Sequence, residues 1–325
     1  MRILVTGSAG HLGEALARTL PDQGHDVVGL DILESPHTDF VGSVADRELV
    51  ARAVDGVDAI VHAATLHKPH VGSHGRQEFV DTNVTGTVTL LEAAVAANVG
   101  RFVFTSTTSA FGLALTPPPG APAAWITEDV APVPRNVYGV TKTAAEDLCE
   151  LIHRDHGLPV LILRTSRFFP EQDDRDDVRT AYEDANLKVN ELLYRRVDIE
   201  DVVTAHLCAL DRAPELGFGR YIVTATTPFG RDDLQTLRDD APAVVARLFP
   251  DYEAIYAERG WRMFPRIERV YVNERARRDL GWRPRYDFRL ALDRLAAGED
   301  PRSALARDVG AKGYHAESTG PYTVR

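Results

Sequence analysis

The stretch TGSAGHLG at residues 6–13 lies between a short apolar run at 2–6 and a helical pattern at 12–20. Its three glycines allow a tight turn, the close approach of a pyrophosphate, and close packing of a helix on a strand. The backbone N–H groups at the start of the helix then point at the phosphates. The stretch therefore predicts a dinucleotide-binding turn next to the first strand of a parallel sheet.

The alternation of short apolar runs and helical patterns continues beyond this turn. Strands are predicted near 2–6, 26–30, 58–62, 101–106, 159–164 and 220–224, and helices at 12–20, 46–54, 76–98, 138–156 and 199–211. Repeated strand–helix–strand units are typical of an α/β fold with a doubly wound parallel Rossmann sheet.

After residue 226 the pattern changes to short helical pieces and turns that contain proline. We assign residues 1–166 and 197–226 to a dinucleotide-binding Rossmann domain. The remaining residues, 167–196 and 227–325, are assigned to a smaller, mixed substrate-binding domain at the carboxyl edge of the strands, where open sheets bind ligands. A run of charged residues at 171–179 predicts a solvated loop.

Composition and charge exclude several classes of protein. The chain has 325 residues and a net charge of −11, which argues against a nucleic-acid partner because such proteins need a basic face. No apolar run approaches the roughly 20 residues of a membrane helix, and no leader pattern precedes the first strand. The two cysteines lie in helical patterns, so a disulfide framework is not expected. We expect a cytoplasmic protein.

The second predicted strand ends on Asp31, eighteen residues after Gly13. A carboxylate at this place accepts hydrogen bonds from both ribose hydroxyls and repels a 2′-phosphate. The alternative is a turn carboxylate that caps a loop. Because Asp31 comes directly after the strand, we predict that the dinucleotide is NAD rather than NADP.

The stretch YGVTK at 138–142 supplies the chemistry. Tyr138 and Lys142 stand four residues apart, so both lie on one face of a helix. An ammonium beside the phenol, together with a positive nicotinamide, is expected to lower the pKa of Tyr138. We predict that Tyr138 is the general acid and base of a hydride-transfer reaction, while Lys142 holds the nicotinamide ribose.

Five further motifs follow the glycine turn: VHAA at 61–64, NVTGT at 83–87, FTST at 104–107 ahead of Phe111-Gly112, RVDIEDVV at 196–203, and LGWRP at 280–284. With the spacing of three between the glycines, they resemble the extended branch of the short-chain dehydrogenase/reductase superfamily, the NAD-dependent epimerase/dehydratase family. The resemblance runs from residue 1 to about 297.

This resemblance implies a set of site residues. Thr107 becomes the third catalytic residue, which donates to the substrate oxygen, although a slip of one position would give Ser106 or Thr108 this role. Beside Tyr138 and Lys142, the implied cofactor contacts are Gly7, Gly10, His11, Leu12, Gly13, Asp31, Ile32, Ser43, Val44, Ala63, Ala64, Thr65, Asn83, Thr105 and Arg164. The implied substrate contacts are His67, Thr107, Thr108, Arg167 and Phe168.

Within this family the residues favour one activity. Dehydratases carry an Asp-Glu pair directly after the catalytic threonine, whereas this chain has Thr108 and Ser109 there. Epimerisation needs only the tyrosine, because a transient keto intermediate can rotate and receive the hydride on its other face. We therefore expect a sugar or sugar-nucleotide epimerase.

Two alternatives remain open. The stretch RTSRFFP at 164–170 resembles the RIGSxFP element of uronate dehydrogenases, and the fork of Arg167 suits a carboxylate as well as a diphosphate. This favours an NAD-dependent dehydrogenase of a sugar acid or another small hydroxy compound. The second alternative is a non-catalytic NAD-binding regulatory protein.

Histidines and helix faces complete the expectations. His62, His67, His70 and His74 lack the cysteine or paired carboxylate that would complete a zinc site, so no metal is expected. Family resemblance implies a homodimer in which helices 83–98 and 138–156 meet, although their alanines could equally pack on the parent sheet. The tail from Lys312 onward matches no motif.

Overall fold

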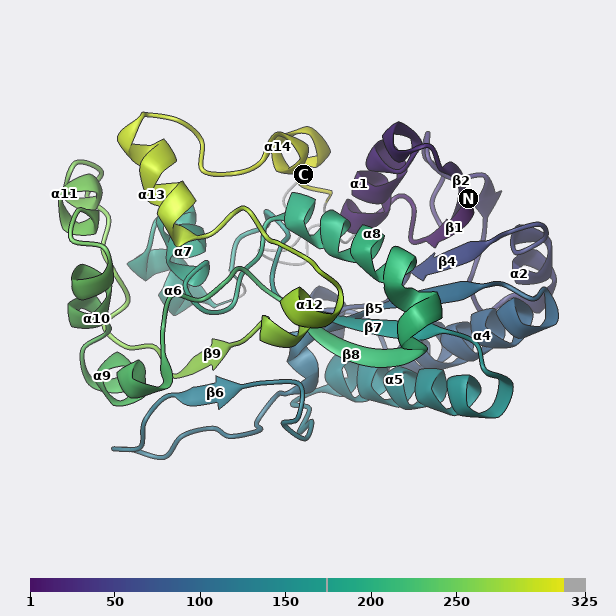
Figure 1. Cartoon of the computed structure of the whole chain (residues 1–325), viewed down its shortest axis with the longest axis horizontal. Coiled ribbons are helices and arrows are strands. Elements are labelled where there is room, and N and C mark those ends of the chain that lie inside the picture. The colour runs from purple at the N-terminus through teal and green to yellow at the C-terminus, as the bar shows by residue number, and fades with distance from the viewer. Residues whose placement is uncertain (174, 313–325) are drawn as a thin grey trace.

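The computed structural model describes residues 1–173 and 175–312 (Figure 1). Its centre is a sheet of seven parallel strands in the order β3-β2-β1-β4-β5-β7-β8. The strands are β1 (Arg2–Thr6), β2 (Asp26–Asp31), β3 (Phe40–Val41), β4 (Ala59–His62), β5 (Arg101–Thr107), β7 (Val160–Thr165) and β8 (Phe218–Val223). The order reverses at β1 and β4, which is the switch point where Rossmann sheets bind dinucleotides.

Helices cover both faces of this sheet. One face carries α1 (His11–Thr19) and α8 (Ile199–Leu216), and the other carries α2 (Arg47–Ala53), α4 (Gly86–Ala96) and α5 (Val137–His156). Alternate residues of β1 serve the two layers, because Ile3 and Val5 pack with α1 and α8 while Leu4 packs with α2 and α4. Burial on both faces explains why the strands are continuous apolar runs.

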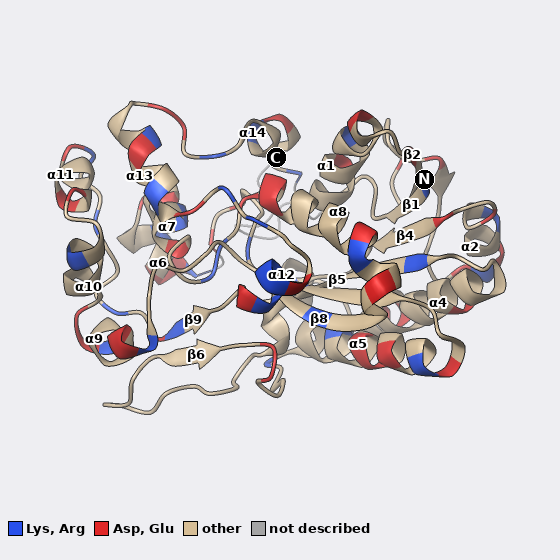
Figure 2. Ribbon diagram, in the orientation of Figure 1, with Lys and Arg blue, Asp and Glu red and all other residues tan. Residues whose placement is uncertain are grey.

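Most of the second half of the chain forms a smaller lobe beside the carboxyl edge of the sheet. Its core is built from α7 (Asp184–Glu191), α9 (Leu234–Asp239), α10 (Ala241–Leu248), α11 (Tyr252–Ala257), α13 (Phe288–Ala296), and the parallel pair β6 (Ala124–Ile126) and β9 (Arg269–Tyr271). Shorter elements are α3 (Arg76–Phe79), α6 (Asp176–Ala181), α12 (Glu274–Asp279) and α14 (Ala304–Val309). Lysine and arginine are mixed with aspartate and glutamate along these helices (Figure 2).

The predicted fold class is confirmed, and all six predicted strands are present. Sequence patterns missed β3, β6 and β9, which have only two or three residues each. The helix predicted at 76–98 is wrong as one continuous element, since a π-helical turn at Val80–Thr85 separates α3 from α4. No helix of the described residues is both long and apolar enough to cross a membrane.

The chain crosses between the lobes several times. Ala123 belongs to the core of the smaller lobe, whereas Trp282 and Val309 pack in the core that α1 and α8 share with the sheet. The domain boundaries given above stay a prediction. Residues 313–325, which include nearly all of the unmatched tail, lie outside the described part of the chain.

Candidate active site

The glycine turn has no room for side chains. Gly7 has a φ of +74°, and a Cβ there would lie 2.8 Å from the backbone nitrogen of Ala64. A Cβ on Gly13 would lie 1.9 Å from the carbonyl oxygen of Gly7, so the helix and the turn are in direct backbone contact. Gly10 caps α1 without a side chain, which leaves the first N–H groups of the helix to meet a phosphate. The turn therefore fits a dinucleotide.

Asp31 lies at the carboxyl end of β2 and joins two backbone segments. Its Oδ2 accepts a hydrogen bond from Ala9 N at 3.0 Å, and its Oδ1 accepts one from Leu33 N at 2.9 Å. The carboxylate thus lies beside the glycine turn, where an adenosine ribose is expected. The next residue, Ile32, is exposed, while Val44 is buried and packs against the α-carbon of Gly86.

Gly13→Ala is expected to lower kcat/KM for NAD by about 100-fold or more, because the added methyl group pushes α1 away from the turn and a misplacement of ~1 Å costs that much. Gly72→Ala is the matched control, since a Cβ there meets nothing within 4 Å. Steady-state kinetics with varied NAD, together with thermal unfolding of both variants, checks this expectation. Equal kcat/KM in the two variants would contradict it.

His11 does not direct its side chain at the dinucleotide turn. Its Nε2 lies 2.8 Å from Oε1 of Glu171, and both side chains are buried. Burial is the largest effect and raises the pKa of Glu171, but the hydrogen bond and charge of His11 together with backbone hydrogen bonds outweigh it, so the pKa lies below the usual value. The prediction of a solvated loop is therefore wrong for Glu171 and Asp173, each 5% exposed. Of the predicted roles of His11, only a backbone contact with a phosphate fits this geometry.

His62 holds the ends of two strands together. Its Nδ1 lies 2.7 Å from Oγ1 of Thr6, and its Nε2 lies 3.0 Å from Oγ1 of Thr87. Burial, and then the charge of Lys142, lowers its pKa well below the usual value, so the ring is neutral. Both nitrogens are therefore used inside the fold. Within residues 1–173 and 175–312, no group of three or more acidic, histidine or cysteine side chains could hold a metal ion.

Asn83 lies in the π-helical turn and fixes the loop after β4. Its Oδ1 accepts from Leu66 N at 2.8 Å and Thr65 Oγ1 at 2.9 Å. Its Nδ2 donates to Leu66 O at 2.8 Å and Thr141 Oγ1 at 3.0 Å. The amide thus ties the loop that carries Ala63, Ala64 and Thr65 to α5. This is a positioning role for a residue predicted to contact the cofactor.

Thr107 lies near Tyr138, and Lys142 follows Tyr138 one turn along α5, while their catalytic roles stay a prediction. Asn136 caps α5 by accepting from Gly139 N at 3.1 Å, which places Tyr138 in the first turn and Lys142 in the second. The hydroxyl of Thr107 lies close enough to the phenol of Tyr138 to lower the pKa of the phenol. Thr107 ends β5, so the sheet and α5 each supply one hydroxyl to the same point.

The neighbours of Thr107 have other partners. Ser106 donates to Glu146 at 2.5 Å, so its hydroxyl belongs to the α5 layer. Thr108 starts a short 3₁₀ turn, Thr108–Ala110, whose cap is the hydroxyl of Thr107. Thr105 Oγ1 lies 2.8 Å from His206 Nε2 on the opposite face of the sheet. Among the three candidates Ser106, Thr107 and Thr108, Thr107 is the one whose hydroxyl lies near Tyr138.

Burial moves the pKa values of Tyr138 and Lys142 in opposite directions. It raises the pKa of Tyr138 to about 12, although the nearby hydroxyl of Thr107 acts the other way. It lowers the pKa of Lys142 to about 7, against the charges of Cys149 and Glu146. The chain alone therefore does not lower the pKa of Tyr138. The predicted lowering includes the charge of a bound nicotinamide and stays a prediction.

Arg164, a predicted cofactor contact, is held on the α5 side of the sheet. Its Nε lies 3.0 Å and its Nη2 2.7 Å from the carboxylate oxygens of Glu146, and both side chains are buried. The guanidinium carbon also lies 4.9 Å from the centre of the Phe111 ring. The ion pair of Arg164 and Glu146 therefore joins β7 to α5, the helix that carries Tyr138 and Lys142. Sequence patterns missed Glu146, because a lone acid in a helix is typical of an exposed face.

Arg167, the predicted substrate contact, lies in a cluster of charges. Its Nη1 donates to Asp173 and, at 2.9 Å, to Glu191. Burial raises the pKa of Glu191, but the charges of Arg195, Arg167 and Arg196 outweigh it and bring the pKa far below the usual value. An anionic substrate group would therefore have to compete with two carboxylates for Arg167.

The other two predicted substrate contacts are Phe168 and His67. Phe168 is partly buried, and its ring centre lies 6.2 Å from that of Phe169. His67 N donates to His70 Nδ1 at 3.0 Å, and the two rings lie 4.8 Å apart. His67 thus shapes the loop between β4 and α3.

The arrangement of glycine turn, acidic strand end, tyrosine and lysine agrees with the family comparison. The sequence profile of the NAD dependent epimerase/dehydratase family matches residues 3–223. The chain belongs to the NAD-dependent epimerase/dehydratase family. Solved relatives share the fold: a short-chain dehydrogenase/reductase superfamily protein from Agrobacterium tumefaciens with bound NAD is 26% identical, with a TM-score of 0.64 over 91% of this chain and 96% of that one.

Sequence relatives in this family carry several activities in their names. A UDP-glucose 4-epimerase from Rhizobium meliloti is 28% identical over 88% of this chain and 93% of that protein. The low-salt glycan biosynthesis protein Agl12 from Haloferax volcanii is 38% identical over 53% of this chain and 58% of that protein. The chain spans about half the length of that relative. It likewise covers 55% and 51% of the length of two further relatives. NAD is the cofactor of the family.

Proposed function

We propose that this family member is an NAD-dependent epimerase of a sugar nucleotide, acting through a transient keto intermediate. The observation that carries the proposal is the closeness of the Thr107 hydroxyl to the phenol of Tyr138 at the carboxyl end of β5, with Lys142 one turn further along α5. Residues 108–110 contribute only Thr, Ser and Ala. The site therefore offers one acid and base, and no second carboxylate for the elimination of water.

In the proposed reaction, Tyr138 takes the proton from a substrate hydroxyl and later returns it. Thr107 donates a hydrogen bond to the same oxygen and fixes its position between β5 and α5. NAD, when bound, supplies the hydride chemistry at the adjacent carbon. Lys142 is buried beside Phe104, with its nitrogen 3.9 Å from the ring centre, and there it meets the ribose hydroxyls. Epimerisation requires that the keto sugar rotate and present its other face before the hydride returns to the carbon and Tyr138 returns the proton to the oxygen.

A dehydrogenase of a sugar acid is the second candidate. The likeness of residues 164–170 to uronate dehydrogenases favours it, because Arg167 stands where an epimerase is expected to have asparagine. Against it, Arg167 already binds Asp173 and Glu191. A non-catalytic regulatory protein is disfavoured because the chain retains Tyr138, Lys142 and Thr107, the residues expected of the catalytic set.

The proposal includes a homodimer that buries the outer faces of α4 and α5. Val140 and Leu151 of α5 are exposed, and so is Val80 in the π-helical turn that precedes α4. Ala94 and Ala145, by contrast, are fully buried in the parent core, so they support the sheet rather than a partner. Sedimentation of the purified protein tests this part.

Asp31→Ser is expected to reduce the preference for NAD over NADP by about tenfold or more, because a carboxylate beside a 2′-phosphate costs several kcal/mol. The measurement is kcat/KM with each cofactor. Asp39→Ser is the matched control, since Asp39 also accepts from a backbone N–H, Gly29 N at 2.8 Å, but does not end β2. An unchanged ratio in the Asp31 variant would contradict the assignment of Asp31 to the ribose.

The activity test gives the protein NAD with either UDP-glucose, UDP-galactose or free glucuronate. An inverted sugar nucleotide without accumulating NADH supports the epimerase. NADH formed in step with an oxidised sugar acid supports the second candidate instead. Tight NAD binding with no conversion of any of these substrates would leave the regulatory role.

A further inference from the structure

Glu146 is a fully buried carboxylate on α5, one helical turn beyond Lys142. Three strands of the sheet meet it. Ser106 of β5 donates to its Oε1 at 2.5 Å, Arg164 of β7 donates to its Oε2 at 2.7 Å, and Nε of Arg220 on β8 lies 3.4 Å from Oε2. Burying a charge costs free energy even when it is paired, and an apolar residue often holds a helix on a sheet equally well. The ion pair alone therefore does not explain why α5 carries a carboxylate here.

The contact with Ser106 connects Glu146 to the proposed catalytic residues. Ser106 immediately precedes Thr107, the last residue of β5. The hydrogen bond from Ser106 to Glu146 therefore joins the strand end that carries Thr107 to the helix that carries Tyr138. A misplacement of ~1 Å in an active site costs about 10²-fold in rate. This hydrogen bond thus acts on how closely the Thr107 hydroxyl approaches the phenol.

Glu146 also supplies a negative charge that acts on Lys142. Burial lowers the pKa of Lys142 to about 7, and the charges of Cys149 and Glu146 oppose this lowering. Burial raises the pKa of the Cys149 thiol well above its usual value, so this thiol is uncharged at neutral pH. From the sheet, the ring of Phe104 and the neutral imidazole of His62 lie near the ammonium. Among these neighbours, Glu146 is therefore the one whose charge helps Lys142 to keep its proton at neutral pH.

We propose that Glu146 is a positioning residue of the active site, which fixes the Thr107 end of β5 against α5 and places a negative charge one turn from Lys142. Arg164 fixes the plane of the carboxylate, because its Nε lies 3.0 Å from Oε1 and its Nη2 lies 2.7 Å from Oε2. Such a two-point pair allows one orientation. The inference rests on the proposed function, because it gives Glu146 a task at the site where Tyr138 and Lys142 act.

The proton affinity of Lys142 is measured on the full chain without NAD or a sugar. The lysines of the chain are Lys68, Lys142, Lys188 and Lys312. Lysine with an isotope label at Cε therefore gives few NMR signals, and the signal missing from Lys142→Met belongs to Lys142. We expect Glu146→Gln to lower the titration midpoint of Lys142 by about one pH unit, the order of the effect of a nearby opposite charge. The lost carboxylate and the unneutralised Arg164 both disfavour the ammonium.

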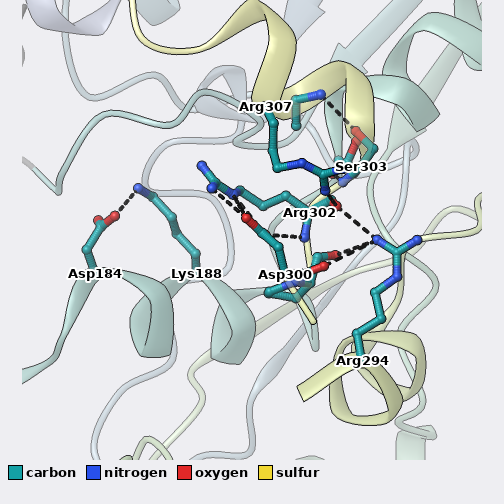
Figure 3. A network of polar contacts seen from close by, with 10 residues as sticks. Asp184, Lys188, Arg294, Asp300, Arg302, Ser303 and Arg307 are labelled. Atoms are coloured by element: carbon teal, nitrogen blue, oxygen red, sulfur yellow. Dashed lines mark hydrogen bonds and ion pairs between the residues drawn. The ribbon is translucent and has the colours of Figure 1, made fainter. Parts of the chain in front are cut away.

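Asp184→Asn is the matched control. Asp184 and Lys188 also stand four residues apart on one helix, α7 of the smaller lobe, and Figure 3 shows them paired with each other. Burial lowers the pKa of Lys188, whereas Asp184 acts to raise it. We expect this variant to lower the midpoint of Lys188 and to leave that of Lys142 in place, and Glu146→Asp, which keeps the charge, to leave both in place. An unchanged Lys142 midpoint in Glu146→Gln, or an equal shift in Asp184→Asn, would overturn the proposal.

Ser106→Ala tests the hydrogen bond to β5 and leaves the pair of Glu146 and Arg164 in place, so it does not depend on how well Glu146→Gln folds. We expect kcat to fall by about tenfold, the effect of one hydrogen bond to a charged acceptor. The KM for the sugar nucleotide and the Lys142 midpoint are expected to change little. A kcat equal to that of the parent would overturn the positioning of Thr107 by Glu146. A parent that converts no sugar nucleotide would refute the proposed function, while the Lys142 midpoint in Glu146→Gln would still decide the role of Glu146.

Discussion

Tyr138→Phe is expected to lower kcat by about 10²- to 10⁴-fold, the usual contribution of a general acid and base. The reason is geometric, because the phenol lies beside the hydroxyl of Thr107 at the carboxyl end of β5. The ring itself is buried and stays in place in the variant, so α5 and the cofactor turn keep their positions. NAD affinity, measured by calorimetry, is expected to change little.

Tyr221→Phe is the control for this variant. Tyr221 is a buried tyrosine of β8 that packs against α8, away from Thr107, so its loss of a hydroxyl is expected to leave kcat nearly unchanged. Two results would argue against Tyr138 as the proton-transfer group. One is an activity of the Tyr138 variant within a few fold of the parent, and the other is an equal loss in both variants.

Lys142→Met is expected to abolish activity and, unusually, to stabilise the protein without NAD. Burial lowers the pKa of Lys142 from 10.5 to about 7, so the unfolded chain binds the proton more tightly than the folded protein does. The cost of burying the ammonium is therefore fully present below about pH 7 and is relieved as the pH rises toward 10.5. Replacing the charge by a thioether of similar length removes that cost.

Thermal unfolding over a range of pH measures this effect. At about pH 6 the variant is expected to melt about 2 °C or more above the parent, since 1 kcal/mol moves the midpoint of a protein this large by roughly that amount. The difference is expected to shrink as the pH rises to about 9, because the parent then gains stability. A variant that is less stable than the parent at pH 6 would show that the contact with Phe104 outweighs the burial of the charge. NAD is expected to protect the parent more than the variant.

The fold was predictable because its strands are buried on both faces. Runs such as Ile3–Val5 are apolar without interruption. In the glycine turn that follows, a side chain on Gly7 or Gly13 would clash with backbone atoms, so the helix packs directly on the backbone of the turn. The common helix face of Tyr138 and Lys142 was also predictable, because residues four apart lie on the same side of a helix. Strand β3 was not, since two residues carry no pattern.

Side-chain partners were much harder to predict. Glu146 and Glu171 are charged residues that sequence patterns assign to the surface, yet each is buried against a cation or a histidine far away in the sequence. A buried charge is tolerated only when it is paired, and the pairing becomes visible only once the fold places the partners together. For the same reason, the ion pairs of Arg167 with Asp173 and Glu191 could not be inferred from the residues next to Arg167 in the sequence.

The central claim is that the site removes and returns a hydride on one sugar carbon, and a deuterium label on that carbon tests it most directly. UDP-glucose deuterated at C4 is incubated with the protein and NAD in ordinary water, and the product is examined by NMR. The proposal predicts UDP-galactose that keeps the deuterium at C4, with no net NADH. Loss of the label to solvent, or NADH formed in step with an oxidised sugar, would contradict it.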